Sequence, residues 1–163
     1  MVKEEKKEQK HTTILVLVVG FVLILAALAL GVKSGWLGSE KIVLGEEYIG
    51  DFVDYKDIST EEYGELVEKK DSFILFVDQN GCETADTVRE FVKDWATEKK
   101  VKVLRIMFSK MKETSLHEYV KYYPSVVVIS EGRPIGYLRA DNNEDAEMYN
   151  NYEVFKGWIE KYF

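Results

Sequence analysis

The stretch from Ser72 to Trp95 constrains the fold more than any other part of the chain, because two hydrophobic periods meet within it. Residues 73–77 form a continuous apolar run, which predicts a strand buried on both faces. Residues 79–81, Gln-Asn-Gly, break this run. Apolar residues then recur at the spacing of one helix face, at Val88, Phe91, Val92 and Trp95. The stretch therefore predicts a central strand that turns directly into a helix.

Cys82, the only cysteine of the chain, lies at this junction of strand and helix. The unpaired amides and the dipole at a helix N-terminus favour an anion, and so favour a reactive thiolate over a thiol. Glu83 and Asp86, in the first turn of the helix, oppose a thiolate by like charge. A single cysteine excludes an internal disulfide and a zinc site of several cysteines. Cys82 is therefore the candidate catalytic residue, as a lone nucleophile.

The charge of the chain is unevenly distributed. The formal net charge is -7, but residues 40–163 contain 17 Lys and Arg against 26 Asp and Glu, a net charge of -9. A region this acidic is a poor match for nucleic acid or for an anionic lipid surface. We therefore expect no nucleic-acid partner. The length of 163 residues suits one folded domain.

Residues 12–32 carry no charge and are almost all Leu, Val, Ala or Ile. Their 21 positions are long enough to cross a bilayer core, which takes about 20 apolar residues. Four lysines precede this segment in the charged tail, 1–11, whereas two, Lys33 and Lys41, follow it closely. The positive-inside bias then places the N-terminus in the cytoplasm. We expect a single-pass anchor in the cell membrane, with the rest of the chain outside.

A cleaved signal peptide is the alternative, because Ala27 and Ala29 are small residues of the kind that a signal peptidase accepts. The apolar segment is longer than an ordinary signal-peptide core, however, and both alanines lie inside it. We therefore favour an uncleaved anchor, followed by a spacer at 33–45 that contains Gly and Ser and by a folded domain at 46–163. Both alternatives export the domain.

Helical and extended patterns alternate along this domain. Residues 47–55 contain a predicted first strand, and Ser59 is the predicted N-cap of a helix whose first turn carries carboxylates. After the central strand and its helix, residues 101–108 predict a strand and residues 113–122 a helix.

The last third of the domain predicts a hairpin and a closing helix. The β-branched run 126–129 reads as a second strand buried on both faces. A tight turn at 131–134 leads into an antiparallel partner at 135–138, and residues 152–162 form an amphipathic helix. The order β-α-β-α-β-α-β-β-α indicates an α/β fold, a mixed sheet flanked by helices on both faces.

This order of elements resembles that of the thioredoxin family, and the resemblance covers residues 45–163. In that family the redox motif, two cysteines separated by two residues, occupies the same strand-to-helix junction as Cys82. Pro124 stands in the place of the family's cis proline, which lies across from the redox thiol beside the backbone that binds a partner's extended chain. Gly132 matches the turn glycine of the hairpin that follows.

The resemblance implies that Gly81, Tyr123 and Pro124 bind the partner. It also implies that the Tyr123–Pro124 peptide is cis and within side-chain reach of Cys82. A proline before a buried strand can also set a turn in trans, and the local sequence leaves that alternative open.

The sequence departs from the family pattern at three informative positions. Gly81 stands where the family has an aromatic residue, Ala85 replaces the second cysteine, and Phe76 replaces a buried aspartate thought to handle the proton of the second thiol. The loss of the resolving thiol fits the loss of its proton acceptor. The chain therefore resembles a member that no longer runs a two-thiol cycle, and an adduct on Cys82 must be released by an external thiol.

Two other clusters are weaker candidates. Residues 141–147 carry oxygen ligands as a calcium loop does, but Ala146 replaces the glycine and Tyr152 the glutamate that such a loop needs. A solvated acidic loop is the better interpretation, and we expect no metal and no cofactor. A set of tyrosines could line a peptide groove near the proline, although residues at helical spacing are more often core: Tyr119, Tyr122, Tyr123, Tyr149 and Tyr152.

The sequence thus predicts a membrane-anchored, extracytoplasmic thioredoxin-like protein. It would exchange or isomerise the disulfides of an exported protein or peptide partner through Cys82, as a thiol-disulfide oxidoreductase or isomerase without a resolving cysteine. The alternative is a redox-inactive adaptor that keeps the fold and binds an exported protein or peptide. A third, less favoured role is an immunity or accessory factor for a secreted peptide.

Overall fold

The computed structural model describes the folded unit of the chain, residues 40–163. The predicted tail (1–11), the predicted membrane anchor (12–32) and most of the predicted spacer lie outside the described residues. Among residues 40–163, no helix is both long and apolar enough to cross a bilayer. The unit begins before residue 46, because Ile42 is buried and its N–H donates to the Tyr162 carbonyl at 2.7 Å.

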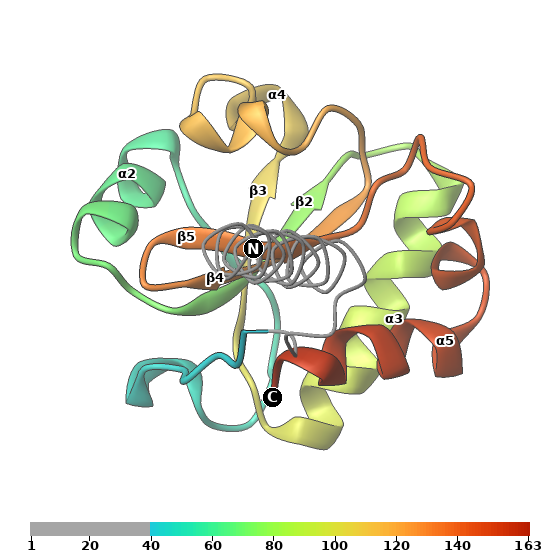
Figure 1. Ribbon diagram of the computed structural model, residues 1–163, viewed down its shortest axis with the longest axis horizontal. Coiled ribbons are helices and arrows are strands. Elements are labelled where there is room, and N and C mark those ends of the chain that lie inside the picture. The colour runs from blue at the N-terminus through green and yellow to red at the C-terminus, as the bar shows by residue number, and fades with distance from the viewer. Residues whose placement is uncertain (1–39) are drawn as a thin grey trace, which may run out of the picture. The chain divides into compact units, whose positions relative to one another are not determined.

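A five-stranded mixed sheet forms the centre of this unit, in the order β1-β3-β2-β4-β5 (Figure 1). β3 pairs in parallel with β1 and β2, whereas β4 pairs antiparallel with β2 and β5. The mixed sheet predicted from the sequence is therefore confirmed. Its strands are β1 (Lys56–Asp57), β2 (Phe73–Asp78), β3 (Val103–Met107), β4 (Ser125–Ser130) and β5 (Arg133–Tyr137).

Helices cover both faces of the sheet, as Figure 1 shows. α3 (Glu83–Lys99) and α5 (Tyr152–Ile159) lie on one face, and α5 continues into the turn η4 (Glu160–Tyr162). α2 (Thr60–Glu68) and α4 (Phe108–Met111) lie on the other face. This arrangement confirms the prediction that helices flank the sheet on both sides.

The central strand β2 supplies both hydrophobic cores, because its side chains alternate between the two faces. All six of its residues are fully buried. Ile74 and Phe76 pack in the core beneath α3 and α5, with Val88, Val92, Trp95, Phe155 and Ile159. The alternate residues of β2 point to the opposite face and pack in the other core, which includes Phe73, Leu75, Val77, Tyr63, Phe108, Met111 and Leu116.

The predicted start of α2 is confirmed by its cap. The Ser59 hydroxyl accepts from the Glu62 N–H at 3.2 Å, and the Glu62 carboxylate accepts from the Ser59 N–H at 2.8 Å. This reciprocal pair is a capping box, which satisfies two amides that the helix leaves without partners.

Two predicted elements are wrong. Residues 47–55 contain no extended strand: the 3₁₀ turn η1 (Glu46–Tyr48) is followed by a single bridge at Ile49, and the first strand is the two-residue β1. Residues 113–122 form no continuous helix, because only the 3₁₀ turn η2 (Ser115–Glu118) lies there. Buried side chains still anchor both segments to the core, Tyr48 in the first and Leu116 with Val120 in the second, so irregular backbone suffices there.

The hairpin of β4 and β5 is confirmed, and Gly132 is essential to its turn. This residue has a positive φ of 74°, and its N–H donates to the Asp71 carbonyl at 2.9 Å. A Cβ at this position would lie 2.5 Å from the Val67 carbonyl oxygen. Only glycine fits both the backbone conformation and the space.

We expect Gly132→Ala to lower the free energy of unfolding by about 2 kcal/mol or more, because it adds both backbone strain and a clash. Gly64→Ala is the matched control: Gly64 lies inside α2 and an added Cβ meets nothing within 4 Å. That change should raise the stability by about 0.5–1 kcal/mol. Urea unfolding of both variants measures the difference, and equal effects would contradict this account of the turn.

Candidate functional site

The end of β2 and the start of β4 lie side by side at one edge of the sheet. Val77 pairs with Ser125 in the antiparallel register, so the next positions on the two strands are Asp78 and Pro124. Cys82 follows Asp78 after a short turn. Because β2 and β3 run parallel, this edge is the carboxyl end of both, the place where open α/β sheets commonly bind ligands.

Cys82 is the N-cap residue of α3, as the sequence predicts for a thiol at a helix start. Its side chain is partly exposed and makes no capping hydrogen bond. Gly81, just before it, has a positive φ of 75°, and an added Cβ would meet nothing within 4 Å. The glycine therefore serves the backbone conformation of the turn. Ala85, at the place of the missing second cysteine, is fully buried in the core.

The Tyr123–Pro124 peptide is cis, which confirms that part of the expectation. Two hydrogen bonds fix the loop around Pro124. The Tyr149 hydroxyl donates to the Pro124 carbonyl at 3.0 Å, and the Ser125 hydroxyl donates to the Leu138 carbonyl at 2.7 Å. Burial raises the pKa of Tyr149, so its hydroxyl remains a donor. Tyr149, from the turn η3 (Ala146–Tyr149), thus supports the proline loop and does not line a groove.

Three tyrosines on the chain leading to Pro124 are exposed. The exposed fractions are 44% for Tyr119, 55% for Tyr122 and 39% for Tyr123. The ring of Tyr123 packs on Phe108 with centroids 4.8 Å apart, which fixes one of its faces. Tyr152 packs against α3 instead. Exposed, partly fixed tyrosines of this kind are typical of protein-binding surfaces.

A charged cluster at the end of β2 was missed by the sequence analysis. Asp78 is fully buried, and Arg89 from α3 binds both of its oxygens, with Nε–Oδ2 at 3.1 Å and Nη2–Oδ1 at 2.7 Å. Arg105 from β3 places Nη1 3.7 Å from Asp78 Oδ2 and binds Asp57 with two bonds of 2.6 and 2.9 Å. The Tyr55 hydroxyl donates to the Arg89 carbonyl at 2.5 Å.

These contacts raise the pKa values of three side chains in the cluster, Arg89, Arg105 and Tyr55. The hydrogen bond with Asp78 holds the pKa of Arg89 above its ordinary value, and the hydrogen bond with Asp57 does the same for the pKa of Arg105. Burial, with the charge of Asp78, raises the pKa of Tyr55. Both guanidinium groups therefore stay charged and Tyr55 stays neutral over the ordinary pH range. The sequence feature that could have revealed this cluster is an aspartate directly after a buried apolar run. A carboxylate at such a position is buried and needs a charged partner.

The cluster also reaches the first turn of α3, through the ion pair of Arg89 with Asp86. Phe76 fills the core at the position of the family's aspartate, and the buried carboxylate of this chain stands two residues later, on the same face of β2. Arg89 Nη1 lies 2.5 Å from Asp86 Oδ1, so one of the two first-turn carboxylates is ion-paired.

The acidic loop 141–147 is less solvated than predicted. Asp145 is buried and accepts from the Arg139 N–H at 2.8 Å, and its Oδ1 lies 3.0 Å from Arg139 Nη2. The prediction of a solvated acidic loop is wrong for this one residue, whose charge a nearby arginine satisfies. Within residues 40–163, no group of three or more His, Cys, Asp or Glu side chains is placed to hold a metal ion.

No protein-family model and no curated protein sequence matches the chain. Among solved structures, a single-site mutant of thioredoxin from Halobacterium salinarum is 14% identical, with a TM-score of 0.49 over 69% of this chain and 90% of that one. The thioredoxin pre-protein of Schistosoma mansoni is 13% identical, with a TM-score of 0.49 over 70% and 100%. Thioredoxin from Trypanosoma brucei brucei is 13% identical, with a TM-score of 0.46 over 66% and 92%.

These similarities are too distant to carry an argument about activity. The description of the fold as thioredoxin-like rests on the molecule itself: the strand order, the helices on both faces, the cysteine at the start of α3 and the cis proline before β4.

We expect Asp78→Asn to lower the free energy of unfolding by about 2–4 kcal/mol, because it leaves two guanidinium groups without their buried carboxylate. The matched control is Asp86→Asn, which removes an exposed partner of the same Arg89 and should cost less than about 1 kcal/mol. Thermal and urea unfolding measure both values. An Asp78→Asn variant as stable as the control would mean that the cluster does not hold β2, β3 and α3 together.

Proposed function

We propose that the chain is a single-pass, membrane-anchored thioredoxin-like protein whose lone thiol, Cys82, exchanges or isomerises the disulfides of exported partners. The observation that carries the proposal is the position of Cys82: partly exposed, without a capping bond, at the N-terminus of a 17-residue helix. The cis Pro124 lies at the same edge of the sheet. Oriented amides at a helix start favour the thiolate that such chemistry needs.

The proposed exchange balances without a cofactor. Cys82 loses its proton to solvent, and the thiolate attacks one sulfur of the partner's disulfide. A mixed disulfide forms between Cys82 and that sulfur, while the partner's second sulfur leaves as a thiolate. An external thiol, or another thiol of the partner in the case of isomerisation, then attacks the mixed disulfide and frees Cys82. Ala85 has no sulfur, so the chain cannot release the partner by itself.

Two features support binding of the partner at the proline loop. The Pro124 carbonyl is held in place by Tyr149, and the exposed rings of Tyr119, Tyr122 and Tyr123 lie on the segment that leads to the proline. An extended partner chain would run along this loop, with backbone hydrogen bonds supplying affinity and the tyrosines supplying contact area. Gly81 would leave room for the partner's backbone beside Cys82.

A redox-inactive adaptor is the second candidate. Ala85 favours this function, because the position where a second thiol would stand carries a methyl group that is fully buried in the core. In that function the exposed tyrosines and Pro124 bind an exported protein or peptide, and Cys82 is dispensable. The two candidates differ in one measurable property, the reactivity of Cys82.

We expect Cys82 to react with iodoacetamide at pH 7 about three- to tenfold faster than free cysteine, because it is partly exposed at a helix N-terminus, where reactive thiols are commonly found. In cells, partner bands linked by disulfides should appear on a non-reducing gel for the native chain and disappear for Cys82→Ser. A reaction no faster than that of free cysteine, together with full function of Cys82→Ser, would leave the adaptor as the function.

Ala85→Cys serves as a matched gain-of-chemistry variant. A second thiol three residues along the helix should attack the mixed disulfide, so the partner bands should weaken although Cys82 is intact. Since Ala85 is buried, the variant's unfolding transition must first be shown to match that of the native chain. Unchanged bands in a folded variant would count against exchange at this helix start.

The predicted topology has its own test, because Cys82 is the only cysteine to label. In intact cells, a maleimide that cannot cross membranes should label the native chain and not Cys82→Ser. An N-terminal epitope that remains on the labelled, membrane-bound chain would establish an uncleaved anchor at 12–32. Labelling only after lysis would overturn the outward orientation, and loss of the epitope would favour the signal peptide.

A further inference from the structure

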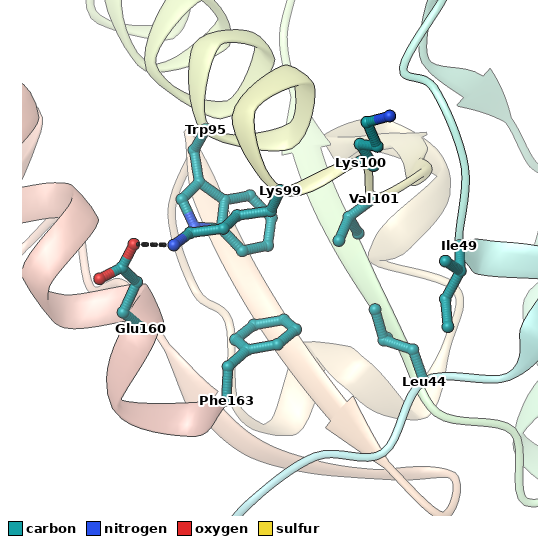
Figure 2. A pocket seen from close by; sticks show the side chains of 8 residues that line it. All are labelled: Leu44, Ile49, Trp95, Lys99, Lys100, Val101, Glu160 and Phe163. Carbon is teal, nitrogen blue, oxygen red and sulfur yellow. Dashed lines mark ion pairs between the residues drawn. The ribbon is translucent and has the colours of Figure 1, made fainter.

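The turns at the two ends of α3 are held in place to very different degrees. At the C-terminal end, Lys99 Nζ lies 2.7 Å from Glu160 Oε1, as Figure 2 shows. The backbone that follows is also fixed, because the N–H groups of Lys100 and Val101 both donate to the Ala96 carbonyl. The chain therefore leaves the helix through a turn with several hydrogen bonds.

The turn that leads into α3, residues 79–81, has far fewer contacts. The Gln79 N–H donates to the Asp78 carboxylate at 2.7 Å. Among residues 40–163, however, neither the side chain of Asn80 nor the N–H of Gly81 has a hydrogen-bond partner. Both residues are exposed, and a Cβ added at Gly81 would meet nothing within 4 Å. The turn thus combines free polar groups with open space.

An asparagine followed by a glycine brings a nucleophile close to an electrophile. The backbone nitrogen of the glycine can attack the side-chain amide carbon of the asparagine, because the two are held in one chain and close a five-membered ring. A side chain on the second residue would obstruct this attack, and glycine has none. A hydrogen bond to either group would oppose it, since the bond must first be broken. Asn80 and Gly81 meet both conditions.

The other four asparagines of the chain do not meet them. None is followed by glycine. Asn142 Oδ1 accepts from the Glu144 N–H at 3.0 Å, and this bond also engages the nitrogen that would attack Asn143. The Asn150 side chain donates to a backbone carbonyl at 2.9 Å, and that of Asn151 accepts from two N–H groups at the start of α5. These four residues therefore serve as internal controls.

We propose that Asn80 is a site of spontaneous modification, at which the chain loses ammonia with time. The Gly81 nitrogen gives its proton to water and forms a bond with Asn80 Cγ, while the bond from Cγ to Nδ2 breaks and ammonia leaves with a proton from water. Water then opens the resulting succinimide ring at either of its two carbonyls. One product is aspartate. The other is isoaspartate, in which the main chain runs through the former side chain. The reaction uses only the turn and water, and asparagine is known as a thermolabile residue.

Both products change the turn that precedes Cys82. Aspartate adds a negative charge two residues before the thiol, and isoaspartate adds one carbon to the main chain between β2 and α3. Gly81 belongs to the proposed partner-binding residues, so the surface that meets the partner would change with the age of the protein. This consequence rests on the function proposed above, whereas the modification itself does not.

The test follows the full chain in phosphatidylcholine nanodiscs at neutral pH, with a reductant that keeps Cys82 a thiol. Samples taken over several weeks are digested, and mass spectrometry identifies each asparagine that has become an acid. Methyl transfer by protein isoaspartate methyltransferase then distinguishes isoaspartate from aspartate. We expect Asn80 to convert within about tenfold of its rate in a peptide of residues 76–86, because a turn with so few contacts opens at little cost. Both acids should form, and the other four asparagines should remain amides.

Two variants sharpen the test. Asn143→Gly places a glycine after Asn142, whose side chain is held by Glu144. Asn142 should then convert at least about fivefold slower than Asn80, although both stand before a glycine. Gly81→Ala should slow the conversion of Asn80 about tenfold in the chain and also in the peptide, where no fold is at stake.

Three results would overturn the proposal. The first is a conversion of Asn80 in the chain that is more than about tenfold slower than in the peptide, because the turn would then be rigid. The second is the formation of aspartate without isoaspartate, which would exclude the succinimide. The third is equal conversion of Asn80 and Asn142 in the Asn143→Gly variant.

Discussion

The structure depends on the burial of β2, a strand that no water reaches. Every residue from Phe73 to Asp78 is buried, and the strand pairs with β3 on one side and β4 on the other. Its alternating side chains feed two cores, so the helices must lie on both faces of the sheet. Because the strand cannot shift by one residue without exchanging its faces, its register fixes where the chain must leave the sheet.

The place where β2 ends is set by Asp78. A buried carboxylate is tolerated only with partners, and these come from two other elements, Arg89 of α3 and Arg105 of β3. The ion pairs therefore tie the first turns of α3 to the end of the parallel strands. Cys82 lies between Asp78 and Arg89 in the sequence, so the same contacts limit how far the thiol can move. In this way a structural charge cluster positions the candidate nucleophile without touching a substrate.

The sequence predicted the elements whose signal is local. β2, α3, β4 and α5 each carry a continuous apolar run or a clear helical period, and Ser59 with Glu62 forms a cap that spans four residues. The cis peptide before Pro124 followed from a resemblance, since local sequence leaves cis and trans open. Residues 47–55 and 113–122 were predicted wrongly, because a few buried side chains, Tyr48 in the first segment and Leu116 with Val120 in the second, hold irregular backbone against the core.

The parts of the site that sequence reasoning missed depend on distant partners. Arg105 stands 27 positions after Asp78, and Tyr149 stands 25 positions after Pro124. No local sequence pattern around these residues indicates which distant residue each of them contacts. The sequence analysis also counted both Glu83 and Asp86 as charges that oppose a thiolate. Arg89 lies between Asp78 and Asp86 and binds both, so the first turn of α3 carries less unpaired negative charge than its sequence suggests.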